Sequence, residues 1–187
     1  MQPDQSDIDR QYLKAMEIDL WLTRDADELP SVNTHAAVAN TALPIRQWSA
    51  EQLQQSLGQL QVDSGADGQF ELLVVTEGAA ASDKCTELMG SMFSAIKVAA
   101  NQWTQAGTAE GGSQSLASLI NTVNPKAVVL MIRSEGNSLD ALRGMQHRLQ
   151  GVTPFVITTF HPQDLLDNPE IKRPAWEDLK QLRQWLG

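Results

Sequence analysis

The segment TTFHPQDLLDNPEIKRPAWEDLK, Thr158 to Lys180, decides the fold class because it joins a strand to a helix through a short turn. Its first residues close the run PFVITTF (154–160), which is rich in β-branched and aromatic residues, as strands are. His161 and Pro162 then form a turn. Beyond the turn, Pro174 stands near the start of an amphipathic helix, a position that suits proline. The segment predicts a buried strand followed by a helix that covers it.

Two further apolar runs of this kind precede it, FELLVV (70–75) and KAVVLMI (126–132). Near-continuous apolar runs are typical of strands that are buried on both faces. The segments 84–103 and 138–145 have helical periodicity and lie between these strands. Strands that alternate with helices favour a parallel sheet. We therefore expect an α/β domain over residues 70–187, with three layers (αβα) and a mainly parallel central sheet.

Two sections of different character come before this domain. Residues 1–25 contain the amphipathic segment DRQYLKAMEIDLWLTRD (9–25), which predicts a short N-terminal helical peptide. A helix this short is marginal in water unless its apolar face packs on something, either its own domain or a partner. Residues 26–69 are poor in periodic apolar positions and indicate a linker. Within this linker, Ser49 and Gln52 have the spacing of a capping box and predict a short helix.

The charge balance bears on the class of partner. The 187 residues carry a formal net charge of -9, and binding to nucleic acid normally requires a face of lysine and arginine. We therefore expect direct DNA binding to be weak or absent and protein partners to be favoured. Cys85 is the only cysteine, which excludes an intrachain disulfide and a cysteine-ligated metal centre. The chain has no apolar run of membrane-spanning length and begins with a polar, acidic stretch, so a cytoplasmic location is expected.

Polar segments follow each of the three predicted strands. They are TEGAAASDK (76–84), RSEGNS (133–138) and HPQDLLDN (161–168). Because the carboxyl ends of parallel strands lie at one edge of a sheet, we expect these three segments to meet there and form the candidate site. His35 and His147 have no neighbours at the spacing of a metal site, so we expect neither a metal nor a cofactor.

The C-terminal third of the chain, 142–186, resembles the uracil-DNA glycosylase superfamily, especially the branch that carries an iron–sulfur cluster. In that family a strand is followed by His-Pro, two variable residues and Leu-Leu, then by a helix that contains Trp-Glu-Asp-Leu. The segment LLVVTEGAAASD (72–83) takes the place of the family's first motif. The matching residues of the C-terminal motif are His161, Pro162, Leu165, Leu166, Trp176, Glu177, Asp178 and Leu179.

This resemblance implies roles for several residues. The loop formed by His161, Pro162, Leu165 and Leu166 would enter DNA, and His161 together with Glu77 or Asp83 would be the catalytic candidates. The same residues also have ordinary structural interpretations. His161 suits a hydrogen-bonded turn, while Glu77 and Asp83 precede a predicted helix whose N-terminus stabilises acidic side chains.

The sequence departs from the family pattern at the positions that carry the chemistry. The cluster cysteines are missing, and alanines replace the proline and second glycine of the first loop. Asp167 stands where the family commonly has an arginine, which reverses the charge expected near a phosphate. These departures favour a scaffold without catalysis. The alternatives are a cluster-free uracil-DNA glycosylase acting in DNA repair, or a pocket that binds a nucleobase without cleaving it.

A second resemblance concerns the N-terminal segment RQYLKAMEIDLWLTRD (10–25), which is similar to the N-terminal peptide of psi subunits of bacterial DNA polymerase III holoenzymes. The resemblance implies that this peptide docks on the clamp-loader ATPase subunit. It also implies that the α/β domain contacts the chi subunit, which links to single-stranded DNA-binding protein. The expected function is thus a non-catalytic accessory role in DNA replication. The expected partner-binding residues are Tyr12, Leu13, Met16, Ile18, Trp21 and Arg24.

Overall fold

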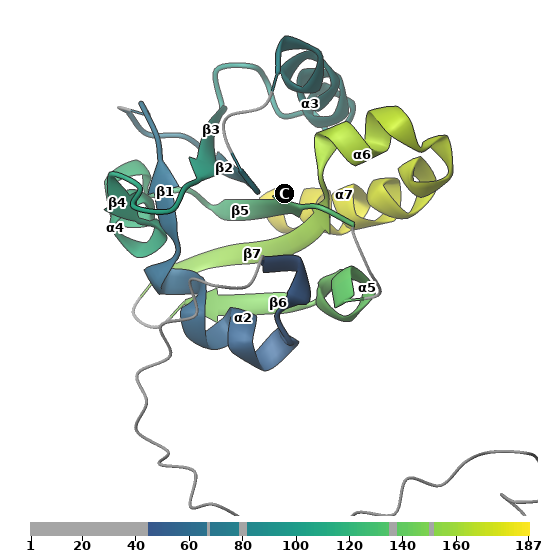
Figure 1. The fold of residues 1–187 in the computed structure, drawn as a ribbon. Coiled ribbons are helices and arrows are strands. Elements are labelled where there is room, and N and C mark those ends of the chain that lie inside the picture. Colours follow the sequence, from purple (N-terminus) through teal and green to yellow (C-terminus); the bar gives the residue numbers. More distant parts are fainter. Residues whose placement is uncertain (1–44, 67, 79–81, 135–137, 150–151) are drawn as a thin grey trace, which may run out of the picture. The chain divides into compact units, whose positions relative to one another are not determined.

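The computed structural model of the chain is shown in Figure 1. The α/β class predicted from the sequence is confirmed by helices and strands that alternate along the chain. The predicted N-terminal peptide lies outside the described residues. The residues that the structure describes are 45–66, 68–78, 82–134, 138–149 and 152–187.

The described strands form one sheet in the order β4-β1-β3-β2-β5-β7-β6. The four inner strands β3, β2, β5 and β7 are mutually parallel, whereas β1, β4 and β6 pair antiparallel at the two edges. The sheet is therefore mixed, with its parallel pairings confined to the centre. The strand bounds are β1 Gln61–Asp63, β2 Leu72–Thr76, β3 Trp103–Thr108, β4 Gln114–Ser115, β5 Ala127–Ile132, β6 Gln146–Leu149 and β7 Val152–Phe160.

Helices pack against both faces of this sheet. Alternate residues of the inner strands belong to two separate apolar clusters, as on β2, where Leu73 and Val75 join one cluster and Leu72 and Val74 the other. Side chains of α2, α4 and α5 complete the first cluster, and side chains of α3 and α7 complete the second. The helix bounds are α2 Ala50–Ser56, α3 Asp83–Ala95, α4 Leu116–Val123, α5 Ser138–Leu142, α6 Pro162–Asp167 and α7 Lys172–Leu186, with 3-10 turns at η1 Ile45–Gln47, η2 Leu57–Gln59 and η3 Pro169–Ile171.

Residues 45–63, which the sequence analysis assigns to the linker, contribute to the first apolar cluster. Leu53 and Leu57 are fully buried in it. The predicted capping box at the start of α2 is confirmed, because the Ser49 hydroxyl accepts from the Gln52 N–H and the Gln52 side chain accepts from the Ser49 N–H. The leucines at helical spacing in this segment thus pack into the core of the domain.

Several strands have no counterpart in the sequence prediction. The largest, β3, reads WTQAGT, whose polar side chains are half-buried and give no apolar run. β1 and β4 are only three and two residues long, and β6 is an edge strand of mixed character. These strands also bring the antiparallel pairings, which is why the sheet is mixed. Continuous apolar runs reveal strands that are buried on both faces, whereas short or half-buried polar strands give no such signal.

Candidate functional site

The described residues of the three predicted site segments meet at the carboxyl end of the parallel strands, as the sequence analysis expects. Glu77 follows β2, Arg133 follows β5, and His161 follows β7. The Glu77 N–H donates to the Met131 carbonyl at 2.9 Å, and the His161 N–H donates to the Ile132 carbonyl at 2.8 Å. The backbone pairing with β5 thus continues one residue past the ends of β2 and β7 and fixes the positions of Glu77 and His161.

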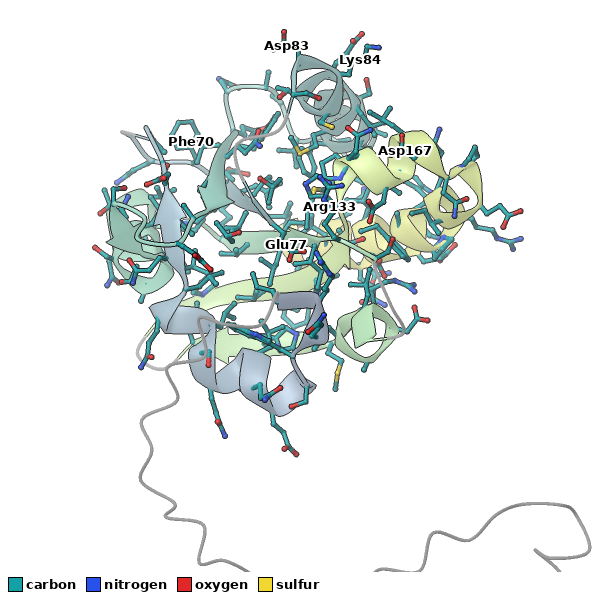
Figure 2. All side chains as sticks on the ribbon, viewed as in Figure 1. Phe70, Glu77, Asp83, Lys84, Arg133 and Asp167 are labelled. Carbon is teal, nitrogen blue, oxygen red and sulfur yellow. The ribbon has the colours of Figure 1, made fainter. Side chains whose placement is uncertain are left out.

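Glu77 is held by backbone and side-chain donors. Its Oε2 accepts from the Arg133 N–H at 2.8 Å, and its Oε1 lies 3.4 Å from Nη1 of Arg46. The Glu77 side chain is only 12% exposed. Figure 2 shows the labelled Glu77 and Arg133 close together near the end of β5. Because both of its carboxylate oxygens have partners, the Glu77 side chain holds the residue that follows β5 close to the end of β2.

Asp164 in the first turn of α6 forms the second polar contact of the site. Its Oδ2 accepts from the N–H and from the hydroxyl of Ser134, each at 2.7 Å. Its Oδ1 lies 3.9 Å from Nη1 of Arg133, whose side chain is 40% exposed. The Ser134 hydroxyl therefore donates to a carboxylate, and its hydrogen bonds fix the loop after β5 against α6.

His161 acts as the N-cap of α6. Its Nδ1 accepts from the Gln163 N–H at 3.1 Å, and the residue is 4% exposed. Burial lowers the pKa of His161, the nearby Arg133 guanidinium lowers it further, and Asp164 opposes both effects. The neutral imidazole is therefore favoured, because Nδ1 must stay unprotonated to accept the capping hydrogen bond.

The lowered pKa of His161 predicts acid destabilisation. The unfolded chain takes up this proton as the pH falls through the ordinary value of 6.5, while the folded chain does not. Folding stability therefore falls as the pH drops below that value, with a slope of at most about 1.4 kcal/mol per pH unit for one proton. His161→Asn keeps a capping oxygen but does not titrate.

Urea unfolding of wild type and His161→Asn at several pH values tests this expectation. The stability difference should move in favour of the variant as the pH falls below neutrality. His147, whose pKa burial also lowers, is present in both proteins and cancels in the comparison. A difference that stays constant with pH would contradict the capping role.

The other members of the predicted DNA-contacting loop differ in exposure. Pro162 and Leu165 are buried, and Leu166 is 36% exposed. Gln163, between them, accepts a contact from the Cys85 thiol at 3.5 Å and donates to the Asp167 carboxylate at 3.0 Å. Most of this loop thus packs into the fold, and Leu166 is its exposed apolar residue.

Asp83 lies apart from the other catalytic candidates. It is the first residue of α3 and is exposed. Figure 2 shows Asp83 beside Lys84 at the outer end of α3, well away from Glu77 and Arg133. Asp83 therefore cannot act on the same atom as Glu77 in this arrangement. The expected partner-binding residues lie outside the described residues: Tyr12, Leu13, Met16, Ile18, Trp21 and Arg24.

Three polar residues of the site were not assigned a role from the sequence. Ser134 directly follows β5, and Asp164 lies in the first turn of α6, a position that suits acidic residues. Their positions next to the strand ends were a usable signal. Arg46 lies in the predicted linker, 31 residues before Glu77 in the sequence. No local pattern indicates that these two side chains contact each other.

The described residues contain no group of three or more histidine, cysteine, aspartate or glutamate side chains placed to hold a metal ion. Within the same residues, no helix combines the length and the apolar character needed to cross a membrane. A scan against protein-family models and a search of curated proteins both find no match for the chain. Its function is therefore argued from its own sequence and geometry.

Proposed function

We propose that the chain is a non-catalytic accessory protein of DNA replication, a psi-like adaptor that acts in the cytoplasm. Its N-terminal peptide would dock on the clamp-loader ATPase subunit of DNA polymerase III. Its α/β domain would contact the chi subunit and so link the clamp loader indirectly to single-stranded DNA-binding protein. The adaptor would need no cofactor, and its own contact with DNA would be weak or absent.

One observation carries the non-catalytic part of this proposal. Two of the candidate catalytic groups, Glu77 and His161, both accept hydrogen bonds from backbone groups of the fold. A general base must lie within hydrogen-bond reach of the proton that it removes. The Glu77 carboxylate accepts from Arg133 and contacts Arg46, and Nδ1, the acceptor nitrogen of the neutral His161 ring, caps α6, so both groups already have partners within the fold.

The architecture supports the choice of scaffold. A domain of the uracil-DNA glycosylase type, with three layers and a mainly parallel central sheet, needs parallel inner strands with helices on both faces. The strands β3, β2, β5 and β7 are parallel, and apolar clusters lie on both of their faces. In this proposal the scaffold is retained for protein contacts, with Glu77 and His161 serving as structural residues.

The docking proposal rests on the N-terminal residues and is tested on them. A C-terminally tagged full-length chain is used to capture proteins from the lysate of its host, with wild type run beside Trp21→Ala. Tryptophan anchors often dominate the binding energy of such peptides. Clamp-loader subunits should appear with wild type and disappear with the variant.

Thr23→Ala serves as the matched control, because Thr23 lies in the same peptide but outside the set of residues that match psi subunits. It should capture the clamp loader as wild type does. Equal capture by wild type and Trp21→Ala would refute docking through this peptide.

The alternative function, a cluster-free uracil-DNA glycosylase, is favoured by the position of Glu77 and His161 directly after β2 and β7, two parallel strands that both pair with β5. It predicts release of uracil from single-stranded DNA, with the activity lost in Glu77→Gln and in His161→Ala. The adaptor proposal predicts no abasic product from wild type even with enzyme in excess over DNA. Release of uracil by wild type, together with its loss in both variants, would establish the alternative.

A further inference from the structure

Helix α7 carries a stripe of positive charge on an otherwise acidic chain. We define the α7 stripe as the following exposed residues of this helix: Lys172, Arg173, Trp176, Lys180 and Arg183. At about 100° per residue, these five side chains fall within roughly 100° of the helix circumference. The buried residues Ala175, Leu179 and Leu182 occupy the adjoining arc of the helix. The stripe therefore forms one continuous exposed face beside the buried side of α7.

The cations of this stripe are poorly neutralised. Elsewhere in the fold, Lys126 faces Glu71, Arg133 faces Asp164, and Arg143 faces Asp178. Within the stripe, Lys180 pairs with Glu177. Among the described residues, no carboxylate lies within ion-pair distance of the other three cations of the stripe. The stripe thus keeps most of its positive charge available to a partner.

Two of these cations also occupy an unfavourable position. Lys172 and Arg173 stand in the first turn of α7, which contains no acidic residue. The N-terminal end of a helix carries a partial positive charge and disfavours cations there. The dipole of α7 itself does not favour this placement, and Glu170 in the preceding turn η3 supplies the acidic residue at the start of the continuous helical segment.

Trp176 lies in the middle of the stripe and is 40% exposed. The other exposed tryptophan of α7, Trp185, stacks on Phe155 with ring centroids 4.3 Å apart. Within the described part of the chain, Trp176 has no such ring partner. An exposed indole among cations can bind an apolar side chain or a second π system, and tryptophan and arginine are the residues most enriched at binding hot spots.

We propose that the α7 stripe is a docking surface for a short, extended acidic segment of a partner protein that carries one apolar or aromatic anchor for Trp176. The stripe rises about 16 Å from Lys172 to Arg183, the reach of roughly five extended residues. A nucleic acid fits less well. A longer polyanion would extend beyond the stripe onto the surface of a chain whose net charge is -9.

The test uses the full-length chain and a fluorescein-labelled peptide, Glu-Asp-Glu-Asp-Gly-Phe, followed by fluorescence anisotropy at low salt. The peptide should bind saturably, and Lys172→Glu with Arg183→Glu should weaken binding by about tenfold or more. Lys84→Glu with Lys126→Glu changes the net charge equally at exposed sites outside the stripe, and should change the affinity by less than about twofold.

Further comparisons isolate the chemistry of the partner. Trp176→Ser should weaken the binding of the phenylalanine peptide. It should leave unchanged the affinity for a peptide with glycine in place of phenylalanine. The proposal is overturned if the neutral peptide Gln-Asn-Gln-Asn-Gly-Phe binds as tightly, or if the two double variants lose affinity equally. It is also overturned if an oligothymidylate of equal charge binds more tightly than the acidic peptide. None of these results depends on docking through the N-terminal peptide, so the two proposals can fail separately.

Discussion

Replacing Asp178 with alanine is expected to lower the free energy of unfolding by about 3 kcal/mol or more, the largest stability loss foreseen for a polar residue of this domain. Asp178 is 3% exposed on α7. Its Oδ2 accepts from Nε of Arg143 at 3.0 Å and from the Thr159 hydroxyl at 2.7 Å. The carboxylate thus connects α7 to β7 and to the segment that follows α5.

Burial raises the pKa of Asp178, and the hydrogen bonds from Arg143 and Thr159 oppose this rise. The direction means that desolvation of the carboxylate outweighs the attraction of its partners. Truncation to alanine is costly because it leaves Nε of Arg143 and the Thr159 hydroxyl without their acceptor. The Arg143 guanidinium lies 4.8 Å from the centre of the Phe160 ring, which holds it in place after the partner is lost.

Asp140→Ala is the matched control, because Asp140 contacts the same arginine at 3.3 Å but its side chain is 79% exposed. Its removal should change stability by no more than about 0.5 kcal/mol. Urea unfolding followed by circular dichroism measures both effects. A loss below about 1 kcal/mol for Asp178→Ala would show that the pair does not hold the two elements together.

Replacing Glu77 with alanine is the second large effect, with an expected loss of about 2–3 kcal/mol in the free energy of unfolding. The substitution removes the acceptor of the Arg133 N–H and one charged contact of Arg46. Glu77→Gln keeps an acceptor oxygen and should lose less than half as much. Glu71→Ala removes a more exposed glutamate, 39% accessible, that pairs with Lys126, and should be nearly neutral.

This series separates a structural carboxylate from a catalytic one. Catalytic groups are frequently held at a cost to stability, so their removal is neutral or stabilising. A structural Glu77 predicts the loss described above, together with no change in any activity on uracil-containing DNA. An alanine variant as stable as wild type would contradict the structural role and return Glu77 to the list of catalytic candidates.

The sequence predicted the parts of the fold that are buried on both faces. The runs that became β2 and β5 are mostly apolar, and the run that became β7 is rich in β-branched and aromatic residues, which is typical of buried strands. The capping box of α2 was predictable because it depends on two residues three positions apart. The polar strand β3 was not, because its place between β1 and β2 is set by pairing with distant segments.

The site was predictable in position but not in its contacts. Parallel strands bring their carboxyl ends to one edge, so the meeting of the segments after β2, β5 and β7 could be expected. The contact between Arg46 and Glu77 could not, since it depends on how η1 packs beside the sheet. The sequence also does not indicate that Asp83 is exposed whereas Glu77, six residues earlier, is largely buried.

The most direct test of the central claim is the affinity of the full-length chain for the purified clamp-loader complex of the same host. Surface plasmon resonance would compare wild type, Trp21→Ala and Thr23→Ala, with all three shown to have equal unfolding midpoints. The account predicts saturable binding by wild type and Thr23→Ala, and a loss of about 30-fold or more for Trp21→Ala. Binding of Trp21→Ala with the affinity of wild type, or no binding by any of the three, would contradict it.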